Sequence, residues 1–83
     1  MTLQQLKYVV TAAECGTISD AAKQLFVSQP SLTNAIKDIE EEMQISIFYR
    51  TNKGITISNE GDEFLAYARQ VLEQANLLED RCV

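Results

Sequence analysis

The stretch SDAAKQLFVSQPSLTNAIKDIEEE, residues 19–42, decides the fold, because it holds two short helical patterns separated by a three-residue turn. Ser19 is the expected N-cap of a first helix over residues 20–26. Ser28 is the expected N-cap of a second helix whose first turn holds Pro30, where the missing N–H of proline has no cost. Two short helices joined in this way predict a helix-turn-helix unit.

The second helix of this unit has one apolar and one polar face. At spacings of three and four, its apolar residues form a stripe that we expect to be buried: Leu32, Ala35, Ile36, Ile39 and Met43. The opposite face carries side chains that can hydrogen-bond to base edges or phosphates. Any amphipathic helix has a polar face, so this face alone does not identify a function. Its combination with a short preceding helix, a proline start and an acid-free first half favours a helix, residues 30–42, that lies in a DNA major groove. The residues predicted to contact DNA from this region are Ser28, Gln29, Pro30, Ser31, Thr33, Asn34 and Lys37.

Another helix precedes this unit. It is predicted to begin after Thr2 as N-cap and to stop at Gly16, with apolar residues at helical spacing between them. Residues 17–18 are expected to form an extended link. In the next helix, Leu25 and Phe26 are expected to fill the core.

The net charge of −5 argues against DNA binding, because phosphate contacts require lysine and arginine. The acidic residues are concentrated in two blocks, with four carboxylates in residues 38–42 and six in residues 59–83. Residues 43–58 hold two cations and no acid. We therefore expect residues 38–42 to point away from the duplex, while the polar face before them lies toward it.

A β-hairpin is predicted after the second helix, over about residues 46–57. Its β-branched and aromatic residues flank the turn-forming sequence Asn52-Lys53-Gly54, in which Gly54 can adopt a positive φ. Arg50 and Lys53 are expected at or near its tip. A basic hairpin after a helix-turn-helix is a wing that contacts the sugar-phosphate backbone or the adjacent minor groove. A solvated hairpin with incidental charge is the alternative.

A long helix is predicted from about Asn59 to Arg81, with Ser58 as its N-cap. Its apolar residues follow a heptad pattern, which Leu65 widens and Cys82 continues. About 24 helical residues span roughly 36 Å, which is longer than one small core can cover. We therefore predict that a second copy of the chain packs on this helix, with packing inside one chain as the alternative. The predicted dimer interface is Phe64, Ala68, Val71, Leu72, Ala75 and Leu78.

Composition excludes several classes of protein. With 83 residues and 46% hydrophobic content, the chain can form one small domain. Cys15 and Cys82 are far apart and there is no histidine, so a CxxC redox pair, a Cys/His zinc site and a histidine-based triad are excluded. No glycine-rich phosphate loop occurs either. An enzyme therefore has little support, and no metal or cofactor is expected. No apolar run approaches the roughly 20 residues of a membrane span, and we expect a cytoplasmic protein that does not bind membranes.

Taken together, these residues resemble the N-terminal winged helix-turn-helix domain of LysR-type transcriptional regulators. The resemblance covers essentially the whole chain and is most specific in AAKQLFVSQPSLTNAIKDIEEE, in IFYR and in the step from Ser58 to Gly61. The family often has a basic residue at the places of Asn34 and Asp38, so the isolated domain is expected to bind DNA weakly. The resemblance implies groove contacts from Gln29, Pro30, Thr33 and Asn34, phosphate contacts from Ser28 and Ser31, and wing contacts from Arg50 and Lys53.

The resemblance also implies a domain organisation and partners. Residues 1–58 would form a mainly α winged helix-turn-helix domain with a three-helix core and a two-stranded wing, and residues 59–83 a linker helix for dimerisation. The partners would be double-stranded DNA and a second copy of the chain, with tetramers in the full-length regulator. A small-molecule effector would bind a C-terminal domain that is absent here. The alternative is an acidic winged-helix and coiled-coil module that binds proteins and no specific DNA, which the net charge of −5 favours.

Overall fold

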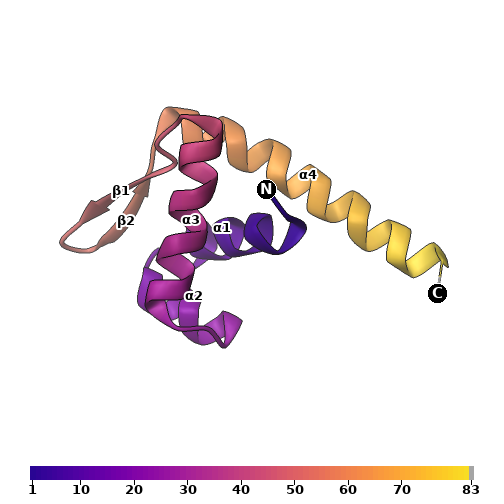
Figure 1. Cartoon of the computed structure of the whole chain (residues 1–83), viewed down its shortest axis with the longest axis horizontal. Coiled ribbons are helices and arrows are strands. Elements are labelled where there is room, and N and C mark those ends of the chain that lie inside the picture. The colour runs from indigo at the N-terminus through magenta and orange to yellow at the C-terminus, as the bar shows by residue number, and fades with distance from the viewer. Residues whose placement is uncertain (83) are drawn as a thin grey trace.

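A computed structural model describes residues 1–82, apart from the side chain of Cys82, and shows a mainly helical chain with one hairpin (Figure 1). This confirms the predicted winged helix-turn-helix. No described helix is both long enough and apolar enough to cross a membrane. The elements in chain order are α1 (Leu3–Cys15), α2 (Ile18–Leu25), α3 (Gln29–Met43), β1 (Phe48–Thr51), β2 (Gly54–Ile57) and α4 (Asn59–Cys82).

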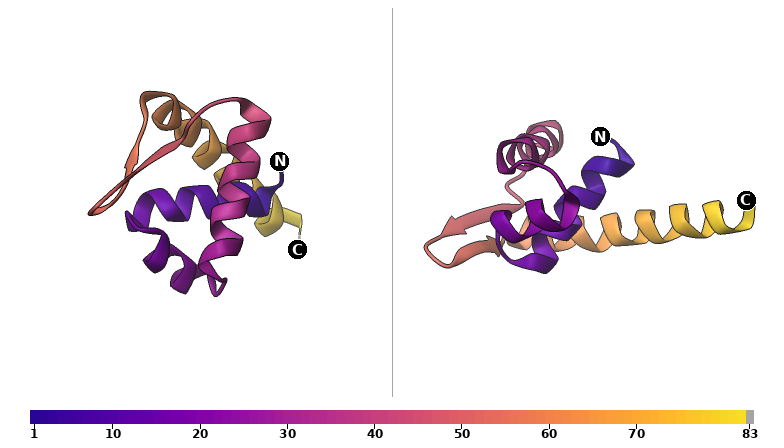
Figure 2. Two further views of the ribbon diagram at one scale, coloured as in Figure 1. Left: turned by 60° about the vertical axis from the view of Figure 1, so that its left-hand side comes forward. Right: turned by 90° about the horizontal axis from the view of Figure 1, so that it is seen from below.

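The core lies around α1, which contacts α2, α3 and α4. Its largest fully buried side chains come from four different parts of the chain, so that the helices and the loop before β1 share one interior. These side chains are Val9, Leu32, Ile39, Ile47 and Leu65. The first half of α4 belongs to this core, whereas its second half extends past the other helices (Figure 2). The molecule is consequently elongated, with extents of 43 × 26 × 19 Å.

Three predicted N-caps are confirmed. The hydroxyl of Thr2 accepts a hydrogen bond from the backbone N–H of Gln5, whose side chain completes a capping box. The hydroxyl of Ser28 caps α3 by accepting from the N–H of Ser31, and the hydroxyl of Ser58 caps α4 by accepting from the N–H of Gly61. The predicted stop at Gly16 is also confirmed, because this residue ends α1 with a φ of 80°.

The predicted bounds of α2, residues 20–26, are wrong by two residues at its start and one at its end. The helix begins at Ile18 because the hydroxyl of Thr17 accepts a hydrogen bond from the N–H of Asp20 at 3.1 Å, which makes Thr17 the cap. Ser19, the predicted cap, lies inside the first turn. Residues 17–18 are therefore the start of a helix and no extended link.

Phe26 is not a core residue, contrary to the prediction. It follows the last residue of α2 with a φ of 58°, and its side chain is 95% exposed. The left-handed conformation reverses the chain before α3 and turns the aromatic ring away from the interior. Met43 is likewise 43% exposed instead of buried, because α3 ends there and runs past the core.

The substitution Phe26→Asn is expected to raise the free energy of unfolding by about 0.5 to 1 kcal/mol. Asparagine adopts the left-handed conformation more readily than phenylalanine, and no buried contact is lost. Urea denaturation measures the change, and Phe26→Leu serves as the control because leucine retains the backbone penalty. A loss of stability in Phe26→Asn would contradict this account and show that the ring makes a stabilising contact.

The hairpin pairs β1 with β2 in an antiparallel register, with Phe48 opposite Ile57 and Thr51 opposite Gly54. Gly54 has a φ of 137°, as predicted for the turn. The hairpin is attached to the core, because the N–H of Ile55 donates to the carbonyl oxygen of Gly16 at 3.0 Å. The orientation of the wing is thus fixed by the connection between α1 and α2.

The start of α4 is attached to the loop that follows α3. The hydroxyl of Ser58 donates to the carbonyl oxygen of Ser46, and its N–H donates to the carbonyl oxygen of Ile47 at 2.9 Å. Gly61 lies one turn further along α4 and approaches the same Ile47 carbonyl closely. These contacts hold the first turn of α4 against the loop before β1.

Candidate nucleic-acid interface

Ser28 is the N-cap of α3, and the other predicted DNA-contacting residues of this region lie in the first turns of that helix. All are exposed except Thr33, which is half-buried. Ser28 and Ser31 are tied together, since the Ser28 hydroxyl accepts from the Ser31 N–H at 3.2 Å and donates to the Ser31 hydroxyl at 2.8 Å. We use the term polar face for Gln29, Pro30, Thr33, Asn34 and Lys37.

Arg50 lies next to the polar face, one residue pair away from the turn of the hairpin. It belongs to β1, where it pairs with Ile55, and its Nη2 donates to the hydroxyl of Thr33 at 3.2 Å. Lys53 does occupy the two-residue turn and is exposed. Of the two predicted wing cations, Arg50 therefore contacts α3, while Lys53 lies at the far end of the hairpin.

A small hollow of about 60 Å³ separates α3 from the wing. Thr33, Lys37 and Arg50 line it together, so one hydroxyl and two cations from two elements meet at one place. Among the residues that the structure describes, the ion pair present is formed by the Met1 amine and Glu42, and neither Lys37 nor Arg50 takes part in one. Both cations are therefore available to an anionic ligand.

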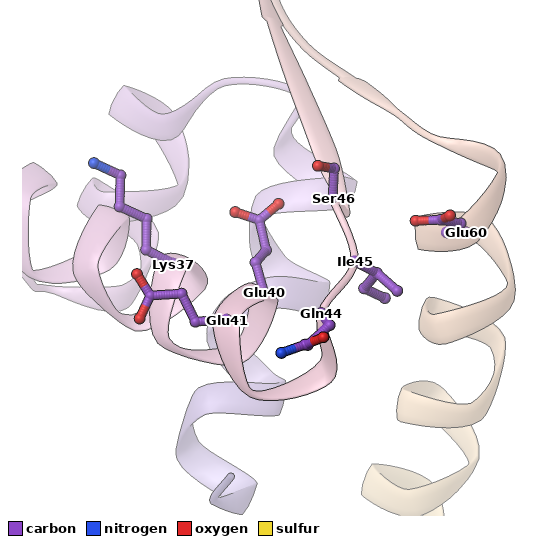
Figure 3. A pocket seen from close by; sticks show the side chains of 7 residues that line it. All are labelled: Lys37, Glu40, Glu41, Gln44, Ile45, Ser46 and Glu60. Atoms are coloured by element: carbon purple, nitrogen blue, oxygen red, sulfur yellow. The ribbon is translucent and has the colours of Figure 1, made fainter.

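The acidic end of α3 differs from the expectation in one residue. The Oε2 atom of Glu40 accepts hydrogen bonds from the N–H groups of Ile47, at 2.7 Å, and Phe48, at 3.4 Å. Figure 3 shows Glu40 turned toward the chain at Ser46, whereas Glu41 projects away from it. Glu40 is thus a structural residue that the sequence did not predict. Nothing in the acidic run distinguishes it from its neighbours.

An open hollow of about 490 Å³ lies beside this end of α3. Glu40, Glu41 and Glu60 line it together with Lys37 (Figure 3). The carboxylates of Glu41 and Glu60, which line this hollow and not the one between α3 and the wing, would repel phosphates and favour a DNA-binding surface on the other side of Lys37, toward the Thr33 and Arg50 pair.

The residues of the predicted dimer interface fall into three groups on α4. Ala68 is 3% exposed and belongs to the core of its own chain. Phe64, Leu72 and Ala75 are half-buried, and Phe64 and Leu72 pack against that core. Val71 and Leu78 are 45% and 64% exposed. Tyr67 and Leu77, which the heptad pattern did not include, are exposed as well.

Comparison with known proteins identifies the family. A family model described as "Bacterial regulatory helix-turn-helix protein, lysR family" matches residues 3–62. The chain belongs to the LysR family. This confirms the resemblance seen in the sequence.

Two relatives illustrate the LysR relationship. The chain is 38% identical over 81 residues to the HTH-type transcriptional regulator TcbR of Pseudomonas sp. (strain P51), covering 98% of this chain and 28% of TcbR. It is 35% identical over 78 residues to the HTH-type transcriptional regulator CzcR of Bacillus thuringiensis subsp. konkukian (strain 97-27), covering 94% of this chain and 27% of CzcR. The chain thus spans little more than a quarter of these relatives, both of which are named as regulators.

Solved LysR-type structures share the fold. The CbnR_DBD–DNA complex matches with a TM-score of 0.93 and 38% identity, over 98% of this chain and 93% of that one. The BenM_DBD complex with catB site 1 DNA matches with a TM-score of 0.91 and 30% identity, over 96% and 86% of the two chains. The long final helix is included in both alignments, since each covers nearly the whole of this chain.

Proposed function

We propose that this LysR-type domain binds double-stranded DNA in a sequence-specific manner, as the DNA-binding part of a transcription regulator and not as an enzyme. The observation that carries the proposal is the Thr33–Arg50 contact, which brings the polar face of α3 and the wing to one side of the molecule. The similar CbnR_DBD and BenM_DBD structures, which are complexes with DNA, support it.

In this proposal α3 lies in the major groove, with its first turn closest to the bases. Gln29 and Asn34 can bind adenine bidentately, while Pro30 starts the helix without a donor that needs a partner. Ser28 and Ser31, at the helix N-terminus, would contact phosphate through their hydroxyls, which the positive end of the helix dipole also favours. Lys53 at the wing tip reaches the backbone or minor groove beside the site.

A salt titration tests the proposal. An operator is first selected from a random DNA pool, and its affinity is then measured at several salt concentrations. If Lys37 and Arg50 together neutralise one phosphate and Lys53 a second, a dimer should give a log–log slope of about −4. Absent or salt-independent binding would favour the protein-interaction module instead. Amide chemical shifts that change only in residues 58–83 on adding DNA would do the same.

The substitution Asn34→Ala is expected to weaken binding to the selected operator by about 1 to 3 kcal/mol and to relax the preference at one base pair. The exposed amide of Asn34 is lost, while no described intramolecular hydrogen bond of its side chain is broken. Fluorescence anisotropy with operator and single-base variants measures both effects, and Gln70→Ala on α4 is the control. Equal losses on every DNA sequence would show that Asn34 contacts phosphate.

We also propose that two copies of the chain associate through α4. The exposed apolar side chains Tyr67, Val71 and Leu78 support this, because they lie along one side of a helix that extends beyond the core. Half-buried Phe64, Leu72 and Ala75 flank that side, whereas Ala68 contributes by packing inside each chain. We keep as a proposal a boundary between a domain of residues 1–58 and a linker of residues 59–83. Leu65 and Ala68 of this linker also belong to the core of the domain.

The substitution Leu78→Glu is expected to raise the dimer dissociation constant at least tenfold, because it places a charge on each side of a symmetric apolar contact. Sedimentation over a concentration series measures the effect. Ala66→Glu is the matched control, since Ala66 is exposed on another side of α4. Unchanged association in Leu78→Glu would assign the dimer contact elsewhere. Truncation near Gly61 is unsuitable, because it removes Leu65 from the core.

For the whole regulator we propose the organisation that its relatives' greater length allows. A further domain would bind a small-molecule effector, and dimers could pair into tetramers on DNA. Regulation of bacterial transcription would place the protein in the cytoplasm. The domain described here requires no metal or cofactor for the contacts proposed.

A further inference from the structure

We propose that Thr33 is a positioning residue, whose hydroxyl holds the guanidinium of Arg50 beside Lys37 so that both cations bind one DNA phosphate. The site is the hollow between α3 and β1. The inference rests on the proposed DNA-binding function and changes the expected role of Thr33, which the sequence alone places among the residues that contact bases.

The contact geometry supports this role. The Nη2 atom of Arg50 lies 3.2 Å from the Oγ1 atom of Thr33, and this hydroxyl belongs to the only half-buried member of the polar face. Lys37 follows Thr33 by four residues, one helical turn later, and lies on the same side of α3. All three side chains line the same hollow. The arrangement therefore brings a hydroxyl and two cations to one small hollow, whose remaining lining is Glu40 and the apolar side chains Ile18, Ile36, Phe48 and Ile55.

The charges around the hollow favour an anion. Neither cation forms an ion pair in the part of the chain that the structure describes. The carboxylate of Glu40 also lines the hollow, but its Oε2 is directed at the backbone N–H groups of Ile47 and Phe48. Binding of Arg50 to phosphate therefore requires no intramolecular salt bridge to be broken.

An arginine whose side chain is already held in place binds phosphate more effectively than a mobile arginine. A guanidinium can donate two parallel hydrogen bonds to phosphate, but a free arginine loses considerable side-chain entropy in doing so. The bond to Thr33 uses one of five N–H donors and restricts the side chain before DNA arrives.

A double-mutant cycle on the selected operator tests the proposal. Thr33→Val removes the hydroxyl at nearly constant volume and should weaken binding about three- to tenfold on operator and on unrelated DNA alike. It should also reduce the salt slope by up to about one. In an Arg50→Ala background, Thr33→Val should have no further effect. Thr33→Ser should restore most of the affinity.

Lys53 provides the matched control, because it is a cation of the same wing that does not contact Thr33. Thr33→Val and Lys53→Ala should therefore be additive. Additivity with Arg50→Ala as well would overturn the proposal, as would no effect of Thr33→Val on binding. A loss confined to the operator, with the salt slope unchanged, would show that Thr33 contacts a base.

Two further measurements distinguish a positioning role of Thr33 from a purely stabilising one, and from a failure of DNA binding itself. Urea denaturation of Thr33→Val shows whether the Arg50 contact only stabilises the wing, because lower stability with unchanged affinity and salt slope would overturn the positioning role. If the wild-type domain shows no salt-dependent binding, the proposed function itself fails. That outcome is distinct from a wild-type domain that binds normally while Thr33 and Arg50 act independently.

Discussion

The variant Gly61→Ala is expected to lose about 3 kcal/mol or more of folding free energy, although glycine to alanine normally stabilises a helix by about 1 kcal/mol. A Cβ at this position would lie 2.3 Å from the carbonyl oxygen of Ile47 and 3.0 Å from its Cα. This backbone cannot easily move, because Ile47 is fully buried and its carbonyl accepts the N–H of Ser58. For a domain with roughly 4 to 12 kcal/mol of stability, the loss is severe.

Urea denaturation of Gly61→Ala and Gly16→Ala measures this effect with an internal control. A Cβ at Gly16 has no heavy atom within 4 Å, so only its left-handed φ of 80° opposes the substitution. Gly16→Ala should therefore lose only about 1 to 2 kcal/mol. A Gly61→Ala domain as stable as the wild type would mean that the first turn of α4 is not held against Ile47.

The variant Glu40→Ala is expected to lose about 2 to 4 kcal/mol, the second large effect. Its carboxylate accepts from two backbone N–H groups, of Ile47 and Phe48, and a hydrogen bond to a charged group contributes about 1.5 to 3 kcal/mol. Without it, the buried start of the wing would hold two donors with no protein partner. Thermal and urea denaturation measure the loss, and Glu40→Gln, which retains one acceptor oxygen, should show about half of it.

Glu41→Ala is the control for this experiment. Glu41 is the next residue in the same acidic run, is exposed, and makes no described hydrogen bond or ion pair. Its removal should change the free energy of unfolding by no more than about 0.5 kcal/mol. Equal effects of the two alanine variants would indicate that the negative charge of the run matters and that the specific contact of Glu40 does not.

Local signals in the sequence predicted most of the fold. Ser28 before Pro30 marks the start of α3, and the Asn52-Lys53-Gly54 turn marks the hairpin, because each depends on the intrinsic geometry of the residues involved. The LysR resemblance agrees with both. Predictions of this kind succeed when a residue type and its neighbours in the chain determine the conformation.

Contacts between distant residues could not be predicted in this way. Two hydroxyl residues, Thr17 and Ser19, flank the first residue of α2, and which of them caps the helix depends on the packing of Ile18, which is buried. Phe26 has a large apolar side chain, as core residues do, but its positive φ is typical of a turn. The roles of Glu40 and of the Thr33–Arg50 pair depend on a hairpin that returns to α3 from later in the sequence.

The attachment of Ser58 to Ser46 and Ile47 affects the spacing between the two DNA half-sites that a dimer would contact. Since the first turn of α4 is hydrogen-bonded to the loop before β1, each α4 and its DNA-binding unit would move as one rigid body. The separation of the two DNA half-sites would then be set by the angle at which the α4 helices of the two copies cross. A signal from elsewhere in a full-length regulator would then change that separation by altering the crossing, because hydrogen bonds of Ser58 hold the first turn of α4 against the loop before β1.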